Sequence, residues 1–269
     1  MKKGKRKTKE KTKRVPDLAT AYAHRGFHSK PDIPENSMPA FRRAIEHGMA
    51  SELDVHLISD GTLVVFHDDD LERETGVKGS IEDYDYKKLS KLRLEGTDEK
   101  IPTFDEVLDL YEDSGLPLLI ELKVVKGNHK ALAAAVCKRL KKYKGNFAIQ
   151  SFYPRVIREV KKLMPGAAVG QLCKNYFNRG DGALMVRTAM LGNFLANLFV
   201  KPDFVSYKLN DRQNKRLHKT INKKGLAKAA WTVRSPEALL KAIKAGSIPI
   251  FEGFDPSDYE AGEESKHKE

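Results

Sequence analysis

Two histidines and an arginine stand at positions where a buried strand has no packing use for them. His24 and Arg25 follow a short apolar run, and His67 ends a second run rich in β-branched residues. An imidazole titrates near neutral pH, so two histidines can accept and donate a proton in one reaction. A guanidinium can bind a phosphate through two parallel hydrogen bonds. The sequence therefore predicts acid–base catalysis by His24 and His67 on a phosphate that Arg25 binds.

Three carboxylates lie on strand patterns that would direct them to a common point. Glu52 and Asp54 alternate with apolar residues on one predicted strand, and Glu121 lies on a later strand, two residues before Lys123. Three negative charges in one interior repel one another strongly unless a cation balances them. Oxygen ligands without cysteine favour Mg²⁺ or Ca²⁺ over structural zinc. We therefore expect a divalent cation here; the alternative is that some of these acids pair with Arg25 or Lys123.

Further polar and aromatic residues end other predicted strands. Lys123 ends the third main strand, and Phe152 and Trp231 end the fourth and the seventh. Asn36 is of a type that commonly forms turns, but it follows the first strand on the same side as His24. We expect Lys123 to bind phosphate, and Asn36, Phe152 and Trp231 to contact the substrate.

The remaining acids and histidines near these positions have supporting or solvated roles. Asp68 is expected to orient His67, and Asp69 and Asp70 to be solvated or to cap the loop. His56 is expected beside the pocket rather than in the reaction. Four further histidines are predicted to be solvated, namely His28, His47, His129 and His218.

The elements that carry these residues alternate strand and helix along most of the chain. Main strands are predicted around residues 21, 55, 120, 149, 169, 205, 230 and 249, with helical patterns between them. This alternation is typical of parallel strands joined by helices, and eight strands favour a closed barrel over an open sheet. The predicted fold is an α/β (β/α)8 TIM barrel, in which the carboxyl ends of the strands share one mouth.

Composition divides the chain into three parts. The first fourteen residues contain nine Lys/Arg and one Glu, which is +8 of the formal net charge of +12. We predict a basic disordered tail over residues 1–17, a barrel domain over 18–258 with a small insertion at about 69–100 after strand 2, and a charged C-terminal tail over 259–269. The tail has the charge to touch an anionic membrane, but no specific nucleic-acid partner is expected.

No apolar run is long enough for a signal peptide or a membrane span. Residues 183–200 are rich in Leu, Met and Phe but are interrupted by polar residues; we expect a barrel helix, with a mobile helix touching lipid as the alternative. The two cysteines, Cys137 and Cys173, are expected to be buried thiols, which suits a cytoplasmic protein.

At the level of motifs the chain resembles the glycerophosphodiester phosphodiesterases of the PI-specific phospholipase C-like superfamily. The resemblance rests on an ordered set of short segments: His24-Arg25-Gly26, Pro34-Glu35-Asn36-Ser37, Ala40-Phe41, Glu52-Leu53-Asp54-Val55, Asp60-Gly61, Val64-Val65-Phe66-His67-Asp68, Ile101-Pro102-Thr103, Glu121-Leu122-Lys123, Gln150-Ser151-Phe152 and Trp231-Thr232-Val233. It implies a TIM barrel with an insertion after strand 2, and metal-dependent hydrolysis of a glycerophosphodiester to sn-glycerol 3-phosphate and an alcohol. In the family's pattern the metal ligands fall on Glu52, Asp54 and Glu121, the catalytic histidines on His24 and His67, and the phosphate contacts on Arg25 and Lys123.

Two positions depart from that pattern. Arg234 follows Trp231-Thr232-Val233 where the family usually has Asn, and Glu252 lies where the family usually has a Thr-Asp-Tyr/Phe-Pro-like run. Arg234 could favour an anionic head group or form a surface salt bridge. Two other functions stay open on the same fold: a lysophospholipase D or sphingomyelinase-D-like activity on lipid at a membrane surface, and an inactive binding module.

Overall fold

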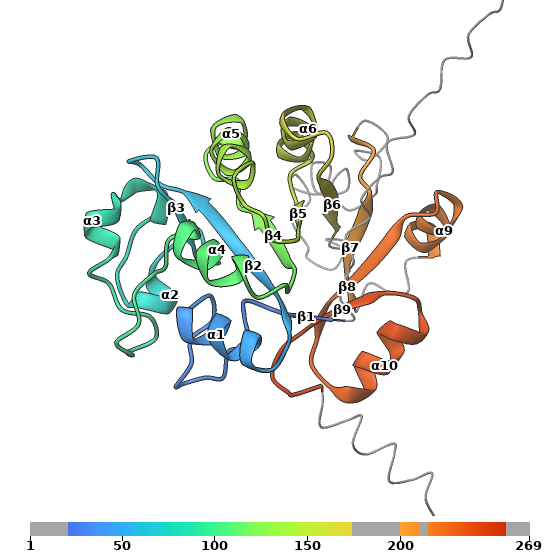
Figure 1. The fold of residues 1–269 in the computed structure, drawn as a ribbon, viewed down its shortest axis with the longest axis horizontal. Coiled ribbons are helices and arrows are strands. Elements are labelled where there is room, and N and C mark those ends of the chain that lie inside the picture. Colours follow the sequence, from blue (N-terminus) through green and yellow to red (C-terminus); the bar gives the residue numbers. More distant parts are fainter. Residues whose placement is uncertain (1–20, 174–199, 210–214, 257–269) are drawn as a thin grey trace, which may run out of the picture.

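A closed barrel of parallel strands forms the centre of the molecule (Figure 1). The structure, a computed structural model, describes residues 21–173, 200–209 and 215–256. Within these residues the parallel strands are β1 (Tyr22–Ala23), β2 (Ala50–Leu57), β4 (Leu118–Leu122), β5 (Phe147–Ser151), β6 (Ala168–Cys173), β7 (Phe204–Lys208), β8 (Ala227–Val233) and β9 (Ile248–Phe251). Tyr22 pairs with Ala50 of β2 and with Ile250 of β9, which closes the ring. The predicted eight-stranded barrel is confirmed.

Helices cover the outside of this barrel. They are α1 (Met38–Glu46), α4 (Phe104–Glu112), α5 (His129–Leu140), α6 (Pro154–Leu163), α9 (Lys215–Lys223) and α10 (Pro236–Lys244). Helix α1 begins at a Ser37 cap, because the Ser37 hydroxyl accepts the Ala40 N–H. Helix α4 begins with a capping box in which Thr103 and Glu106 each accept the other's backbone N–H.

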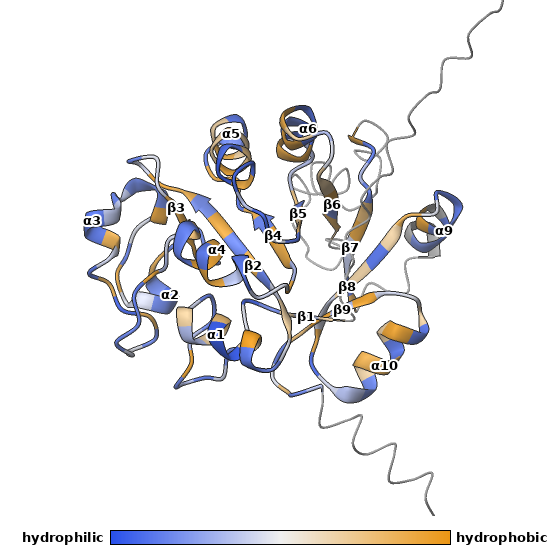
Figure 2. Ribbon diagram, viewed as in Figure 1, coloured by the Kyte–Doolittle hydropathy of each residue, from blue (hydrophilic) through white to orange (hydrophobic). Residues whose placement is uncertain are grey.

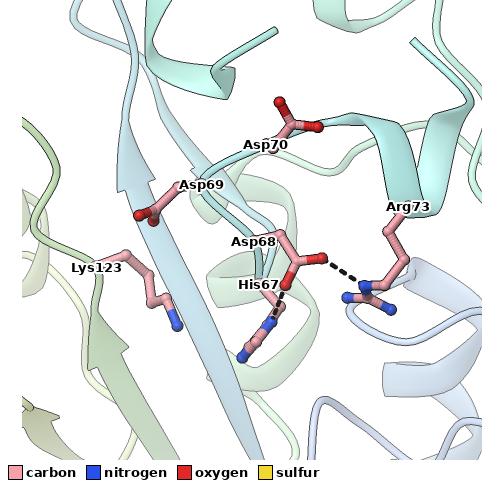
Figure 3. A pocket seen from close by; sticks show the side chains of 6 residues that line it. All are labelled: His67, Asp68, Asp69, Asp70, Arg73 and Lys123. Carbon is pink, nitrogen blue, oxygen red and sulfur yellow. Dashed lines mark hydrogen bonds and ion pairs between the residues drawn. The ribbon is translucent and has the colours of Figure 1, made fainter. Parts of the chain in front are cut away.

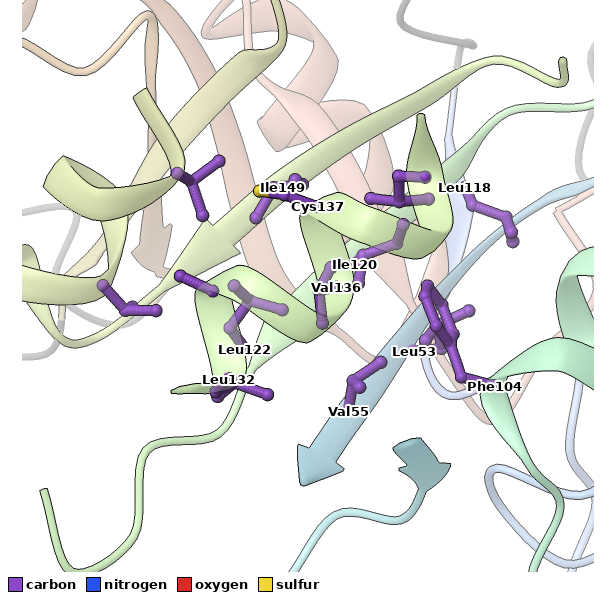
Figure 4. Close-up of a cluster of buried hydrophobic side chains, with 14 of the residues drawn as sticks. Leu53, Val55, Phe104, Leu118, Ile120, Leu122, Leu132, Val136, Cys137 and Ile149 are labelled. Atoms are coloured by element: carbon purple, nitrogen blue, oxygen red, sulfur yellow. The ribbon is translucent and has the colours of Figure 1, made fainter. Parts of the chain in front are cut away.

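Strand β2 shows how one sequence pattern sorts side chains between the two faces of the barrel. Leu53 and Val55 point outward into a buried cluster with Phe104 of α4 and Leu132 of α5 (Figure 4). The alternate residues are polar, and the banding of β2 in Figure 2 shows this alternation. Because successive side chains on a strand point to opposite faces, the β2 acids are directed into the barrel.

The barrel interior changes from apolar to polar along the strands. Its apolar layer contains Tyr22, Ala50, Leu119, Ala148, Ala168, Phe204, Ala229 and Ile250. Gly170 leaves room for this layer, since a Cβ there would lie 2.1 Å from the Phe204 ring. Two residues further along the strands, Tyr22 is followed by His24, Ala50 by Glu52, Leu119 by Glu121, Ala148 by Gln150 and Phe204 by Ser206. The polar groups therefore gather at the carboxyl ends of the strands, above an apolar base.

A small excursion lies beside the mouth, between β2 and α4. The chain turns back after β2 as β3 (Leu63–Val65), which pairs antiparallel with β2, and continues through α2 (Glu72–Thr75), η1 (Ile81–Asp83) and α3 (Tyr86–Leu89). These short elements surround a buried cluster of their own: Ile58, Val64, Phe66, Leu71, Ile81, Leu89, Leu94 and Ile101. The excursion is thus packed against the barrel at the end that carries the polar layer.

Several predictions from composition lie outside the described residues. They concern the tails at 1–17 and 259–269 and nearly all of the apolar segment at 183–200. Among the residues that the structure describes, no helix is both long enough and apolar enough to cross a membrane. Cys137 and Cys173 are both buried, as expected.

Candidate active site

Three buried carboxylates meet at the mouth of the barrel. One oxygen from each of Glu52, Asp54 and Glu121 lies within 4.8 Å of the other two. The backbone N–H of Arg25 donates to Glu52 Oε2 at 3.2 Å, and Asn36 Nδ2 donates to Asp54 Oδ2 at 3.0 Å. The three acids that the sequence placed on two separate strands are therefore brought together, and Asn36 supports one of them.

The electrostatics of this cluster call for a further cation. Burial raises the pKa of Glu52 well above its usual range, and the neighbouring Asp54 and Glu121 raise it further. Burial also raises the pKa of Glu121, against the opposing effect of Lys123. Burial opposes ionisation of Asp54 too, but Lys123, followed by His67 and Arg25, lowers its pKa below the usual range. The cations present thus favour ionisation of Asp54, whereas burial and mutual repulsion disfavour ionisation of Glu52 and Glu121.

Lys123 lies between two of these acids. Its Nζ is 3.2 Å from Glu121 Oε1 and 3.5 Å from Asp54 Oδ1. The alternative that these acids pair with Lys123 or Arg25 is therefore part of the structure, since Arg25 Nε also lies 3.7 Å from Asp54 Oδ2, but two cations cannot neutralise three carboxylates. The donor set consists of oxygens alone, which fits a hard divalent cation such as Mg²⁺ or Ca²⁺.

His24 is fixed by a carboxylate from the opposite end of the chain. Its Nδ1 is hydrogen-bonded to Glu252 Oε2, just after β9, and its Nε2 lies 4.0 Å from Glu52 Oε2. Burial lowers the pKa of His24, and the hydrogen bond from Glu252 offsets this in part. An ionised Glu252 assigns the proton to Nδ1, so Nε2 carries the lone pair that faces the carboxylate cluster.

The two departures from the family pattern contact each other. Arg234 NH2 lies 2.6 Å from Glu252 Oε1, while the other Glu252 oxygen binds His24. Arg234 therefore forms the salt bridge considered above. His28 Nε2 is also 3.9 Å from Glu252 Oε2, and the His28 side chain is only 12% exposed. The prediction that His28 is solvated was wrong, because the loop after β1 folds back over the mouth.

His67 is held in the same manner as His24, from the other side of the mouth. Its Nδ1 is 2.5 Å from Asp68 Oδ1, which agrees with the orienting role predicted for Asp68. Asp68 Oδ2 in turn accepts from Arg73 Nε, on helix α2 (Figure 3).

A hollow of about 440 Å³ opens beside His67, lined by His67, Asp68, Asp69, Asp70, Arg73 and Lys123. Asp70 caps the start of α2 through the Glu72 N–H at 2.7 Å, and Asp69 is exposed, as expected.

A second cavity of about 280 Å³ joins the two histidines. It is lined by His24, Arg25, Glu52, His67, Glu121, Gln150, Phe152, Leu172, Lys208, Trp231, Thr232, Arg234 and Ile250. The Phe152 and Trp231 rings meet edge to face with centroids 5.7 Å apart and form an aromatic wall. All ten predicted site residues lie in this cavity, in the adjoining hollow or in direct contact with the carboxylate cluster.

Arg25 is anchored before any substrate arrives. Its NH1 bonds Glu35 Oε1 at 2.5 Å, and its Nε lies 3.7 Å from Asp54 Oδ2. Burial opposes the charge, but Asp54 and then Glu35 outweigh it and raise the pKa of Arg25. A guanidinium held at two points keeps its orientation toward the cavity.

Sequence reasoning missed several residues of the site. Glu35 stands in a motif but was assigned no role, and Arg73 lies in the predicted insertion, where no residue was expected to bind the substrate. Lys208 ends β7 and lines the cavity, and the rule that strand ends face the mouth would have found it.

His218 was predicted to be solvated, but its ring is half-buried and packs edge to face against Tyr207, with the ring centroids 4.8 Å apart.

His56 does not line the cavity between the two catalytic candidates. Its side chain is fully buried, and its Nδ1 lies 3.4 Å from Glu82 Oε1 of η1. His56 therefore joins β2 to the excursion. His47 and His129 lie on or near the surface.

Histidines, cations and buried carboxylates at the mouth of a closed parallel barrel are groups that suit phosphodiester hydrolysis. Residues 24–253 match the glycerophosphoryl diester phosphodiesterase family, and the chain belongs to this family. It is an enzyme of the phosphodiester hydrolase class.

Named relatives agree with this assignment. A glycerophosphodiester phosphodiesterase of Caldanaerobacter subterraneus subsp. tengcongensis is 31% identical over 236 residues, which is 83% of this chain and 89% of the relative. The Thermotoga maritima glycerophosphodiester phosphodiesterase structure is 28% identical, with a TM-score of 0.66 over 86% of this chain and 93% of that chain. An Oleispira antarctica phosphodiesterase in complex with its product sn-glycerol-3-phosphate shares the fold, with a TM-score of 0.73, 24% identity and coverage of 94% and 98%.

Proposed function

We propose that the protein hydrolyses glycerophosphodiesters to sn-glycerol 3-phosphate and an alcohol, with His24 and His67 as acid and base beside a divalent cation. The observation that carries this proposal is the single cavity that joins both histidines to Glu52 and Glu121. In each imidazole Nδ1 is occupied by a carboxylate, so Nε2 is the nitrogen left for proton transfer. A cavity that offers two such nitrogens suits a reaction with one proton to remove and one to deliver.

The proposed reaction has two stages that use the histidines in opposite order. In the first, one histidine takes the proton from a glycerol hydroxyl while that oxygen bonds to phosphorus. The bond from phosphorus to the alcohol oxygen breaks, and the other histidine protonates this oxygen. In the second stage water opens the resulting cyclic phosphate, and each histidine returns to its starting proton state.

The cations position the phosphate for these steps. Arg25 and Lys123 are the proposed phosphate ligands, and both are held by acids that keep them charged. A divalent cation bound by Glu52, Asp54 and Glu121 would supply further positive charge for the phosphate oxygens. Asn36 would keep Asp54 in place, and Phe152 and Trp231 would pack against the organic part of the substrate.

The proposal is tested by a panel of glycerophosphodiesters assayed for glycerol 3-phosphate release with Mg²⁺, with Ca²⁺ and with EDTA. We expect release from at least one member that EDTA abolishes and one of the two ions restores. His24→Ala and His67→Ala should each lower kcat by at least about 100-fold. His129→Ala is the matched control, because that ring bonds the Gly127 carbonyl of its own turn and is not among the residues that line the cavity. A panel with no EDTA-sensitive release would overturn the proposal.

The lipid-directed alternative depends on parts of the chain outside the described residues. Both the basic tail and the apolar segment at 183–200 motivated it, so contact with an anionic membrane stays a prediction, as does a cytoplasmic location. Lysophosphatidylcholine, offered with and without vesicles beside glycerophosphocholine, separates the two activities. The binding-module alternative conflicts with an enzyme family assignment and with two histidines whose carboxylate partners are intact.

A further inference from the structure

One arginine of the excursion contacts the carboxylates that hold His67 and Arg25. The Asp68–His67 pair and the Glu35–Arg25 pair are the two arms of the site. Arg73 lies on α2, outside the barrel, beside the hollow in Figure 3, and its side chain is 42% exposed. Its Nε donates to Asp68 Oδ2, and its NH2 donates to Glu35 Oε1 at 2.7 Å. Two separate nitrogens of one rigid group therefore bind two separate carboxylates.

Each of these carboxylates supports a different part of the site. Asp68 uses its other oxygen to hold Nδ1 of His67 at 2.5 Å. Glu35 uses the same oxygen to bind NH1 of Arg25 at 2.5 Å. Arg73 is thus one residue removed from the acid–base imidazole on one side and from the phosphate-binding guanidinium on the other.

We propose that Arg73 is a positioning residue that fixes His67, through Asp68, relative to Arg25, through Glu35. This assignment rests on the proposed function, since it takes His67 and Arg25 as the residues that act on the substrate. It also gives the excursion a role: α2 carries the group that joins the two arms across the mouth.

The geometry requires a guanidinium rather than a positive charge alone. A guanidinium presents several N–H groups in a fixed plane, so Nε and NH2 can bind Asp68 and Glu35 together. An ammonium is a single point on a flexible chain and would not hold both acceptors in the same relative position. Lysine at this position should therefore preserve one arm better than the other.

Glu74 provides a control on the same guanidinium. Its Oε1 also accepts from Arg73 NH2, at 2.5 Å. The side chain is buried and lies beside Glu35, and a glutamine there can keep both contacts. Burial and the nearby Glu35 raise the pKa of Glu74 to about 9, so it is neutral at pH 7. Glu74→Gln keeps a neutral acceptor for Arg73 and should leave both arms in place.

The test compares Arg73→Gln and Arg73→Lys with two controls in the full chain. The controls are Glu74→Gln and Arg93→Gln, since Arg93 is an exposed arginine of the same excursion that bonds only nearby backbone carbonyls. Steady-state kinetics use the glycerophosphodiester that the wild type turns over best, and thermal unfolding checks each fold. We expect Arg73→Gln to lower kcat/KM by about 10- to 100-fold, with a lower kcat from the His67 arm and a higher KM from the Arg25 arm. Arg73→Lys should restore one of the two constants, and both controls should stay within about twofold.

A further comparison separates positioning from general stability. If Arg73 acts on kcat through Asp68, adding Arg73→Gln to Asp68→Asn should lower kcat by less than about threefold more. Full additivity of the two kcat losses would overturn the proposal, and so would a folded Arg73→Gln variant with wild-type kcat and KM. If Arg73→Gln does not fold, wild-type values of both constants in Arg73→Lys would overturn it. Failure of the wild type on every substrate would instead refute the proposed function.

Discussion

The bond between Glu252 and His24 gives the most specific prediction about catalysis. Glu252→Gln retains the size of the side chain but replaces an ionised acceptor by an amide. The partner ring is buried, with 8% of His24 exposed, so water cannot replace the lost interaction. A hydrogen bond to a charged group contributes about 1.5–3 kcal/mol, which corresponds to about 10- to 150-fold in rate if the bond is needed in the transition state.

Arg234 supplies an internal comparison, because it binds the other oxygen of the same carboxylate. Its side chain is 66% exposed, and an exposed ion pair contributes at most about 1 kcal/mol. Arg234→Met should therefore lower kcat by less than about fivefold. The ordering of the two variants follows from burial, because Glu252→Gln weakens the buried bond to His24 whereas Arg234→Met removes only the exposed partner of Glu252.

The pH profile distinguishes lost positioning from lost folding. Glu252 raises the pKa of His24 against the effects of burial and of Arg25, so its removal lowers this pKa further. The limb of the kcat/KM profile that reports His24 should then move to lower pH in Glu252→Gln and stay in place in Arg234→Met. Glycerol 3-phosphate release between pH 5 and pH 9 measures both. A Glu252→Gln enzyme within threefold of wild type, with an unmoved profile, would refute the reasoning.

Two further predictions concern stability. Gly26 has φ +77°, and a Cβ there would lie 2.9 Å from Ala40 Cβ, so Gly26→Ala should lower the free energy of unfolding by about 2–4 kcal/mol in urea titrations. A loss below about 0.5 kcal/mol, which is the scatter of surface substitutions, would contradict that packing. The pKa of Glu74 is about 9 in the folded state and 4.5 in the unfolded state. The stability that depends on its proton is therefore fully present below about pH 4.5 and is lost as the pH rises toward 9. Glu74→Gln should therefore raise Tm at pH 8, where the ionisation penalty has an upper limit of about 5 kcal/mol, and leave Tm unchanged at pH 4. Equal gains at both pH values would argue against a neutral Glu74.

Local patterns in the sequence were enough to predict the barrel and the inward-facing acids. The alternation along β2 separated Leu53 and Val55 from Glu52 and Asp54, because side-chain direction on a strand has a period of two. Helix caps such as Ser37 and Thr103 lie within three residues of the groups they bind, so they too could be found locally. The ordered motifs then supplied the roles that periodicity alone does not assign.

Contacts that depend on closing the barrel could not be read in this way. Glu252 is 228 positions from His24 in the chain, and the two meet only because β1 pairs with β9. The only signal was that Glu252 departs from the family's usual residue. Arg73 reaches Glu35 across 38 positions through an excursion with weak periodicity, which gave no indication of its direction. Such partners are set by tertiary geometry, and spacing along the sequence carries little information about them.

Binding of a divalent cation to the three-carboxylate cluster is the most direct test of the account. Isothermal titration calorimetry of the EDTA-treated, dialysed protein with Mg²⁺ and with Ca²⁺ measures it, alongside the turnover assay at the same ion concentrations. The carboxylate geometry predicts one site per chain, turnover that follows its occupancy, and loss of both in Asp54→Asn, whose acid contacts Asn36, Arg25 and Lys123. Full turnover in EDTA, or ion binding that persists unchanged in Asp54→Asn, would contradict it.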